Sequence, residues 1–289
     1  MTLILVVGTE AGTGATTVAT GLAQRFTSVG QNVRVERLSD GSDVGRAEED
    51  AKTFGSLETG SGCGKPLRVE ELSSPDGTLI LEAPIGTDGI SMARELGAKL
   101  VLVKPSEGAG VDAIDSSAVS LKIETRSRNV GSGLLPEDRI LAAPRVSELI
   151  EASDADVLSR SEQGEMALCE HIVVGAISHD AADSYFERFP RSAVVTRNGR
   201  VDLAIAAIAA GATCLILSGG GEPSPYILDR AAASRDTTLM VTSGDTPSTV
   251  HAIEGTFGTS PFSGEAKIMR TGELMQDTVP EDILKRLLV

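Results

Sequence analysis

Apolar runs alternate with amphipathic segments through the first part of the chain. Residues 3–7 form a continuous apolar run, as expected of a strand buried on both faces of a parallel sheet. Residues 15–29 then have helical spacing, because apolar side chains recur every three or four positions. Further strands are predicted at 33–38, 79–81 and 100–103, with a helix at 91–96. This alternation predicts a parallel sheet with right-handed helical crossovers.

A second alternating series begins near residue 171. Its predicted strands are 172–177, 193–196, 214–217 and 239–241. Its predicted helices are 181–189, 201–210, 225–233 and 247–257, and a last helix is predicted at 281–288. The stretches 41–64 and 104–133 are less regular, with at most one helix expected in the first. The pattern predicts an α/β chain in which a parallel-sheet domain precedes a smaller open α/β domain.

Composition narrows the choice of partners. The formal charge is −15, and a field of that sign repels nucleic acid and anionic membrane surfaces. No apolar run approaches the length of a membrane span, so we expect a cytoplasmic protein. The three cysteines are scattered, which argues against a disulfide framework or a zinc site.

A Gly- and Thr-rich segment, GTEAGTGATT, occupies residues 8–17 between the first predicted strand and the first predicted helix. This is the setting of a P-loop, in which backbone N–H groups and a helix N-terminus hold phosphate. The hydroxyl of Thr16 is placed to bind Mg²⁺. The predicted phosphate-binding residues in this segment are Gly8, Thr9, Gly12, Thr13, Gly14, Thr16 and Thr17.

The segment departs from the usual P-loop in two ways. The glycines are separated by five residues, and Ala15 stands where a lysine normally neutralises phosphate charge. Loss of that charge weakens phosphoryl transfer more than binding, so we do not expect a competent ATPase. Arg37 and Lys104 end predicted strands, and either is a candidate for a compensating cation. The alternative interpretation is a Gly-rich turn whose site has decayed.

The longer spacing resembles that of dethiobiotin synthetase and the related cobyrinic acid a,c-diamide synthase group. The resemblance covers roughly the first half of the chain and is specific only in the loop. It implies ATP or another nucleotide with Mg²⁺ as the cofactor, and it implies that Glu82, at the end of the third strand, binds the metal directly or through water. Asp50 is either another acid beside the metal or a plain surface charge.

The second half resembles the DRTGG domain, a module found in the N-terminal regulatory part of long bacterial phosphotransacetylases. The residues that carry this resemblance are 173–177, 194–202 and 215–220, together with the preceding stretch 135–144. We expect three parts: 1–134 as a P-loop domain, 135–168 as a bridge and 169–289 as a DRTGG-like domain. An anion is expected to bind beside Arg197, Arg200, Ser218, Gly219 and Gly220. Alternatively, these glycines only permit tight turns.

The leading functional hypothesis is a ligand-sensing regulatory protein that binds a nucleotide or a phosphorylated metabolite. The resemblance implies a partner such as a phosphotransacetylase or another acyl-phosphate enzyme, and a homo-oligomer fits as well. One alternative is an ATP-dependent carboxylate–amine ligase of the dethiobiotin synthetase type. The other is a scaffold that binds no ligand.

Overall fold

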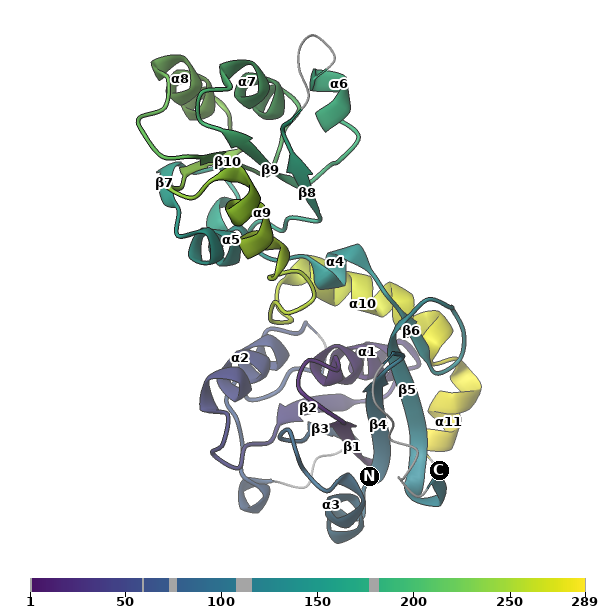
Figure 1. Cartoon of the computed structure of the whole chain (residues 1–289). Helices are drawn as coiled ribbons and strands as arrows, with labels where there is room; N and C mark the ends of the chain where they lie inside the picture. The colour runs from purple at the N-terminus through teal and green to yellow at the C-terminus, as the bar shows by residue number, and fades with distance from the viewer. Residues whose placement is uncertain (1, 59, 73–76, 108–115, 177–181, 289) are drawn as a thin grey trace. The chain divides into compact units, whose positions relative to one another are not determined.

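The computed structural model describes residues 2–58, 60–72, 77–107, 116–176 and 182–288, which form two compact units (Figure 1). The first unit contains Met1–Leu141 and Pro261–Val289, and the second contains Ala142–Ser260. Each unit is built on its own sheet, so the predicted α/β class is confirmed. In the part of the chain that is described, no helix combines the length and hydrophobicity needed to cross a bilayer.

The first unit has a six-stranded parallel sheet in the order β2-β3-β1-β4-β5-β6. The strands are β1 (Thr2–Gly8), β2 (Val33–Arg37), β3 (Thr78–Glu82), β4 (Lys99–Pro105), β5 (Val119–Ser127) and β6 (Leu134–Pro136). The helices are α1 (Ala15–Ser28), α2 (Val44–Gly55), α3 (Gly89–Leu96), α10 (Glu265–Thr278) and α11 (Glu281–Leu288). The short helix α4 (Arg139–Ala142) has its first three residues in this unit and its last residue in the second. All six strands run parallel, so their carboxyl ends lie at the same edge of the sheet, and β1 lies inside it. Ligands of such sheets bind at that edge.

Alternate side chains of β1 are buried on opposite faces of the sheet. Ile4 and Val6 pack into the core under α1, whereas Leu5 and Val7 pack into the core that includes α3. This double burial explains why the strand reads as a continuous apolar run.

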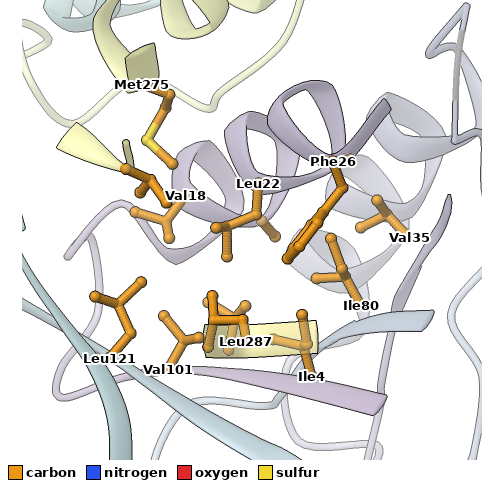
Figure 2. Close-up of a cluster of buried hydrophobic side chains, with 14 of the residues drawn as sticks. Ile4, Val18, Leu22, Phe26, Val35, Ile80, Val101, Leu121, Met275 and Leu287 are labelled. Carbon is orange, nitrogen blue, oxygen red and sulfur yellow. The ribbon is translucent and has the colours of Figure 1, made fainter. Parts of the chain in front are cut away.

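The C-terminal helices complete the core of the first unit. Met275 of α10 and Leu287 of α11 lie with Val18 and Leu22 of α1 in one buried cluster (Figure 2). Gly21 permits the close approach of α1 and α10, since a Cβ atom there would lie 2.3 Å from Cγ of Met275. The core therefore requires the C-terminal segment.

This packing changes the expected domain boundaries. The sequence prediction assigned all of 169–289 to the second domain, but residues 261–289 belong to the first unit. The stretch 142–168, expected to be part of a bridge, instead contributes α5 (Val146–Ser153) and β7 (Asp156–Ser159) to the second unit. The division follows burial of apolar side chains rather than order along the chain.

The second unit has a five-stranded sheet in the order β7-β11-β10-β9-β8, and only the pairing of β7 with β11 is antiparallel. Its remaining strands are β8 (His171–Val174), β9 (Ser192–Arg197), β10 (Cys214–Ser218) and β11 (Thr238–Val241). Its remaining helices are α6 (Ala182–Phe186), α7 (Val201–Ala209), α8 (Pro225–Ala233) and α9 (Thr246–Glu254). The predicted strand 172–177 and helix 181–189 each include positions outside the described residues.

Candidate functional site

The loop of residues 8–17 lies directly after β1 and leads into α1, as the sequence predicts. Gly12 and Gly14 have φ values of 74° and 85°, in the left-handed region that favours glycine. Gly8 closes the curl, because a Cβ atom there would lie 2.4 Å from Oγ1 of the buried Thr13. The first helical hydrogen bond runs from the Val18 N–H to the Gly14 carbonyl, at 3.0 Å.

The loop leaves its backbone donors available. Within the described residues, no carbonyl accepts a hydrogen bond from the N–H groups of residues 10–17. Glu10, Ala11 and Gly12 are exposed, and Gly14 to Thr16 are half-buried. A row of unpaired N–H groups at the positive end of a helix is a site for an anion.

A polar cluster lies behind the first turn of α1. The Thr16 hydroxyl oxygen is 3.0 Å from Oε1 of Glu82 and 3.2 Å from Oδ1 of Asp50. Glu82 ends β3, and Asp50 lies in α2, so three separate elements supply the three oxygen groups. Asp50 is only 6% exposed, and the interpretation as a surface charge is therefore wrong.

Arg37 neutralises this cluster from the end of β2. The side chain is buried, with Nε 3.3 Å from Oδ2 of Asp50 and 4.0 Å from Oε2 of Glu82. Its Nη1 donates to the carbonyl of Leu38 at 2.7 Å. The guanidinium group thus lies near both carboxyl groups and forms its shorter contact with Asp50.

Burial controls the protonation of the two acids. Burial raises the pKa of Glu82 to about 8, and the negative charge of Asp50 adds to this shift. Burial also raises the pKa of Asp50, although Arg37 opposes that effect. A Glu82 that keeps its proton at neutral pH leaves the cluster with little net charge, since Arg37 and Asp50 balance each other.

The oxygen groups of this cluster fit a hard divalent cation. Two carboxyl groups and one hydroxyl are donors of the type that Mg²⁺ prefers, and Mg²⁺ usually completes its shell with water and phosphate. Oε2 of Glu82 is buried and has no hydrogen-bond partner among the described residues. An unpaired buried oxygen at this place is consistent with a further ligand, and cation binding here would release the proton of Glu82.

Lys104, the other expected compensating cation, forms an ion pair within the sheet. Its amine lies 3.2 Å from Oε1 of Glu124, on the neighbouring strand β5. The register pairs these two residues directly, so the contact follows from the sheet itself. Of the two expected compensating cations, Arg37 contacts buried acids and Lys104 contacts a strand neighbour.

Strand β5 supplies two contacts to the loop that the sequence reasoning missed. Oγ1 of Thr125 donates to the Thr13 carbonyl at 2.7 Å, and Nη2 of Arg126 donates to the Gly12 carbonyl at 2.9 Å. The missed signal is the alternation of apolar and charged residues over 119–127, which is typical of a strand with one solvated face.

The predicted anion site of the second unit is arranged differently. The N–H groups of Gly219 and Gly220 donate to the carbonyls of Gly244 and Thr242, at 2.6 and 2.9 Å. They are therefore not available to an anion, and the alternative interpretation as turn glycines accounts for both. The Ser218 hydroxyl is fully buried and lies 2.6 Å from the Thr246 hydroxyl.

The two predicted arginines of this site lie at the end of β9 and the start of α7. Arg197 is exposed and closes the strand. Arg200 forms an ion pair with Asp202, at 2.7 Å between Nη2 and Oδ2. These two cations therefore lie beside a turn in which the N–H groups of Gly219 and Gly220 are already paired.

A known protein family matches most of the second unit. Residues 148–256 match the model of the DRTGG domain, so the chain contains a DRTGG domain. The match extends from α5 to α9 and leaves the whole sheet of the first unit outside.

One similar solved structure comprises the CBS and DRTGG domains of the regulatory region of a Clostridium perfringens pyrophosphatase, complexed with its activator diadenosine tetraphosphate. The identity is 20% and the TM-score 0.36, over 45% of this chain and 55% of that one. The chain thus matches about half the length of that structure, and a similarity this low carries no argument about function.

Proposed function

We propose that this chain is a ligand-sensing regulatory protein whose first unit binds the phosphate groups of a nucleotide or another phosphorylated metabolite. The observation that carries the proposal is the row of backbone N–H groups over residues 10–17, at the carboxyl end of β1, from which no described carbonyl accepts a hydrogen bond. Such a row holds an anion without any charged side chain, because the partial charge of the helix N-terminus acts in the same direction.

Mg²⁺ is the proposed companion of the phosphate groups. Thr16, Asp50 and Glu82 would hold it, and the ion would supply positive charge next to the phosphate oxygens. In this arrangement Arg37 keeps Asp50 oriented, through its 3.3 Å contact, whether or not a ligand is bound.

Sensing rather than turnover follows from the charges around the loop. Ala15 provides no cation, Lys104 is paired with Glu124, and Arg37 is buried against acids. Stabilisation of the charge that develops during phosphoryl transfer is therefore weak, whereas ground-state binding is less affected. The chain contains a DRTGG domain. From the resemblance of this half of the sequence to the regulatory part of long phosphotransacetylases, we propose a phosphotransacetylase or another acyl-phosphate enzyme as the partner.

Titration calorimetry on the full chain tests this proposal. The probes are ATP, ADP, AMP, acetyl phosphate and acetyl-CoA, each with and without Mg²⁺, and ATP hydrolysis is followed in parallel. We expect saturable, Mg²⁺-dependent binding of at least one phosphorylated probe without hydrolysis above background. Thr16→Ala should weaken that binding about tenfold or more, because it removes a ligand of the ion.

Thr27→Ala is the matched control for this experiment. Thr27 lies at the other end of α1, and its hydroxyl has no hydrogen-bond partner among the described residues. Its removal should leave affinity unchanged. The absence of binding by every probe would contradict the proposal, and ATP turnover that Thr16→Ala abolishes would favour the ligase alternative.

A further inference from the structure

The peptide planes of the 8–17 loop need a contact that holds them in place. It is rich in glycine and exposed at residues 10–12, so the free loop has a high conformational entropy to lose when a ligand binds. In an ordinary P-loop a lysine contributes positive charge to the site, and in this chain Ala15 stands at the corresponding position. A contact that orders the loop before binding would improve affinity without adding any contact to the ligand.

The end of β5 makes such a contact through two consecutive residues. Thr125 is buried, and its Oγ1 donates to the Thr13 carbonyl at 2.7 Å. The next residue, Arg126, donates from Nη2 to the Gly12 carbonyl at 2.9 Å. Both bonds are made to adjacent peptide units of the loop.

The backbone of β5 is distorted at the position that makes this double contact possible. Successive side chains of a regular strand point to opposite faces, so Thr125 and Arg126 would not normally reach the same loop. Arg126 has a φ of 55°, in the left-handed region that non-glycine residues rarely adopt. The pairing of β5 with β6 also shifts register between Glu124 and Ser127. This local geometry directs both side chains to the loop.

The two bonds determine where the loop amides point. In a trans peptide the carbonyl of one residue and the N–H of the next point in opposite directions. When β5 binds the carbonyls of Gly12 and Thr13, the N–H groups of Thr13 and Gly14 are turned away from β5. No carbonyl of a described residue accepts a hydrogen bond from either of these N–H groups, so they are presented to the space where an anion would bind.

We propose that Arg126, together with Thr125, is a positioning residue that preorganises the 8–17 loop for phosphate binding. This inference rests on the proposed function of the loop. Arg126 acts through the peptide planes of the loop, and its own guanidinium group does not contact the phosphate. Ordering of the loop thereby compensates in part for the positive charge that the usual lysine would supply.

The test compares Arg126→Asn with Arg126→Lys and with Arg128→Asn. Asparagine tolerates the left-handed backbone but is too short to reach Gly12, whereas lysine keeps a donor at a similar reach. Arg128 is the matched control, since it is exposed, lies two positions away and pairs with Glu107 at 3.0 Å. The probe is inorganic triphosphate with Mg²⁺, and affinity is measured by calorimetry at several salt concentrations.

We expect Arg126→Asn to lose about tenfold in affinity, a loss comparable to that of one hydrogen bond to a charged group. Arg126→Lys should recover most of this loss, and Arg128→Asn should bind like the unmodified chain. Backbone NMR order parameters of residues 10–14 in the ligand-free Arg126→Asn protein should be lower. The slope of affinity against salt should stay unchanged, because no phosphate contact is removed.

Three results would overturn this inference. If triphosphate and every nucleotide fail to bind the unmodified chain, the proposed function fails and the role of Arg126 fails with it. If the unmodified chain binds and Arg126→Asn binds equally well, only the role of Arg126 is wrong. If affinity falls together with the salt slope, Arg126 contacts the phosphate directly and does not act by positioning the loop.

Discussion

The 8–17 loop and the turn at residues 218–221 have similar compositions and opposite hydrogen-bonding states. Both are rich in glycine, and both follow a central parallel strand of their sheet. In the second turn, the N–H groups of Gly219 and Gly220 bind the carbonyls of Gly244 and Thr242. In the first, no described carbonyl accepts from residues 10–17. A glycine-rich turn at a strand end is therefore a candidate anion site only when its donors are left unpaired.

The largest effect is expected from closing the first loop. A Gly8→Val substitution places a Cβ atom 2.4 Å from Oγ1 of the buried Thr13, so the curl cannot keep its shape. The row of N–H groups should then be lost, and calorimetry should show a loss of triphosphate affinity of about a hundredfold or more.

The matched control for this change lies in the second unit. Gly199 follows β9, and a Cβ atom there would have no neighbour within 4 Å. Gly199→Val should retain the affinity of the unmodified chain. Retention of affinity by Gly8→Val, with circular dichroism showing an intact fold, would remove the distinction between the two turns.

The next largest effect is expected on stability, from the buried acids Asp50 and Glu82 behind the first loop, and it depends on pH. The folded-state pKa of Glu82 is raised to about 8 from an ordinary value of 4.5, with burial as the main cause. Below pH 4.5 the carboxyl is protonated in both the folded and the unfolded chain. Between pH 4.5 and about 8 the carboxyl is ionised in the unfolded chain but keeps its proton in the folded chain. The free energy of unfolding therefore falls as the pH rises toward 8.

Glu82→Gln should remove this dependence, since the amide resembles the protonated acid and does not titrate. The gain in unfolding free energy over the unmodified chain should reach the order of 2–4 kcal/mol at pH 8 and should shrink toward pH 5. Thermal unfolding at pH 5 and 8 measures it. Asp88→Asn is the control, because hydrogen bonds from Ser91 lower the pKa of the exposed Asp88 to below this window. If the unfolding free energies of Glu82→Gln and of the unmodified chain changed with pH in parallel, the pKa of Glu82 would not be raised in the folded chain.

Sequence patterns predicted the parts of the fold whose strands are buried on both faces. The strands β1, β3, β4 and β8 to β11 were predicted from continuous apolar runs, whereas β2 was predicted although Arg34 and Glu36 alternate with its valines. The 8–17 loop was predicted because its glycines lie between a strand and a helix. Strand β5 was missed, since Lys122 and Glu124 interrupt its apolar residues on the solvated side. Missing β5 also meant missing Arg126.

The unpredicted helix α10 has a different cause. Its buried residues include Lys267, Thr271 and Thr278, so its inward face does not read as an apolar stripe. Asp50 could not be placed from sequence either, because the polar stretch 41–64 gives no indication of which face of α2 is buried. Both failures concern polar groups that find partners only in the tertiary structure.

The smallest effect is expected in the turn of the second unit, and it provides the converse of the first test. Gly219 has a φ of 89°, and the nearest atom to an added Cβ would be Cγ of Arg197, at 3.9 Å. Gly219→Ala therefore meets no steric clash and costs only the backbone strain, of about 1 kcal/mol. The thermal midpoint of the second unit should fall by a few degrees, whereas triphosphate affinity should not change. A loss of affinity in this variant would mean that the turn contributes to ligand binding in spite of its paired N–H groups, and the hydrogen-bonding criterion that separates the two turns would then be insufficient.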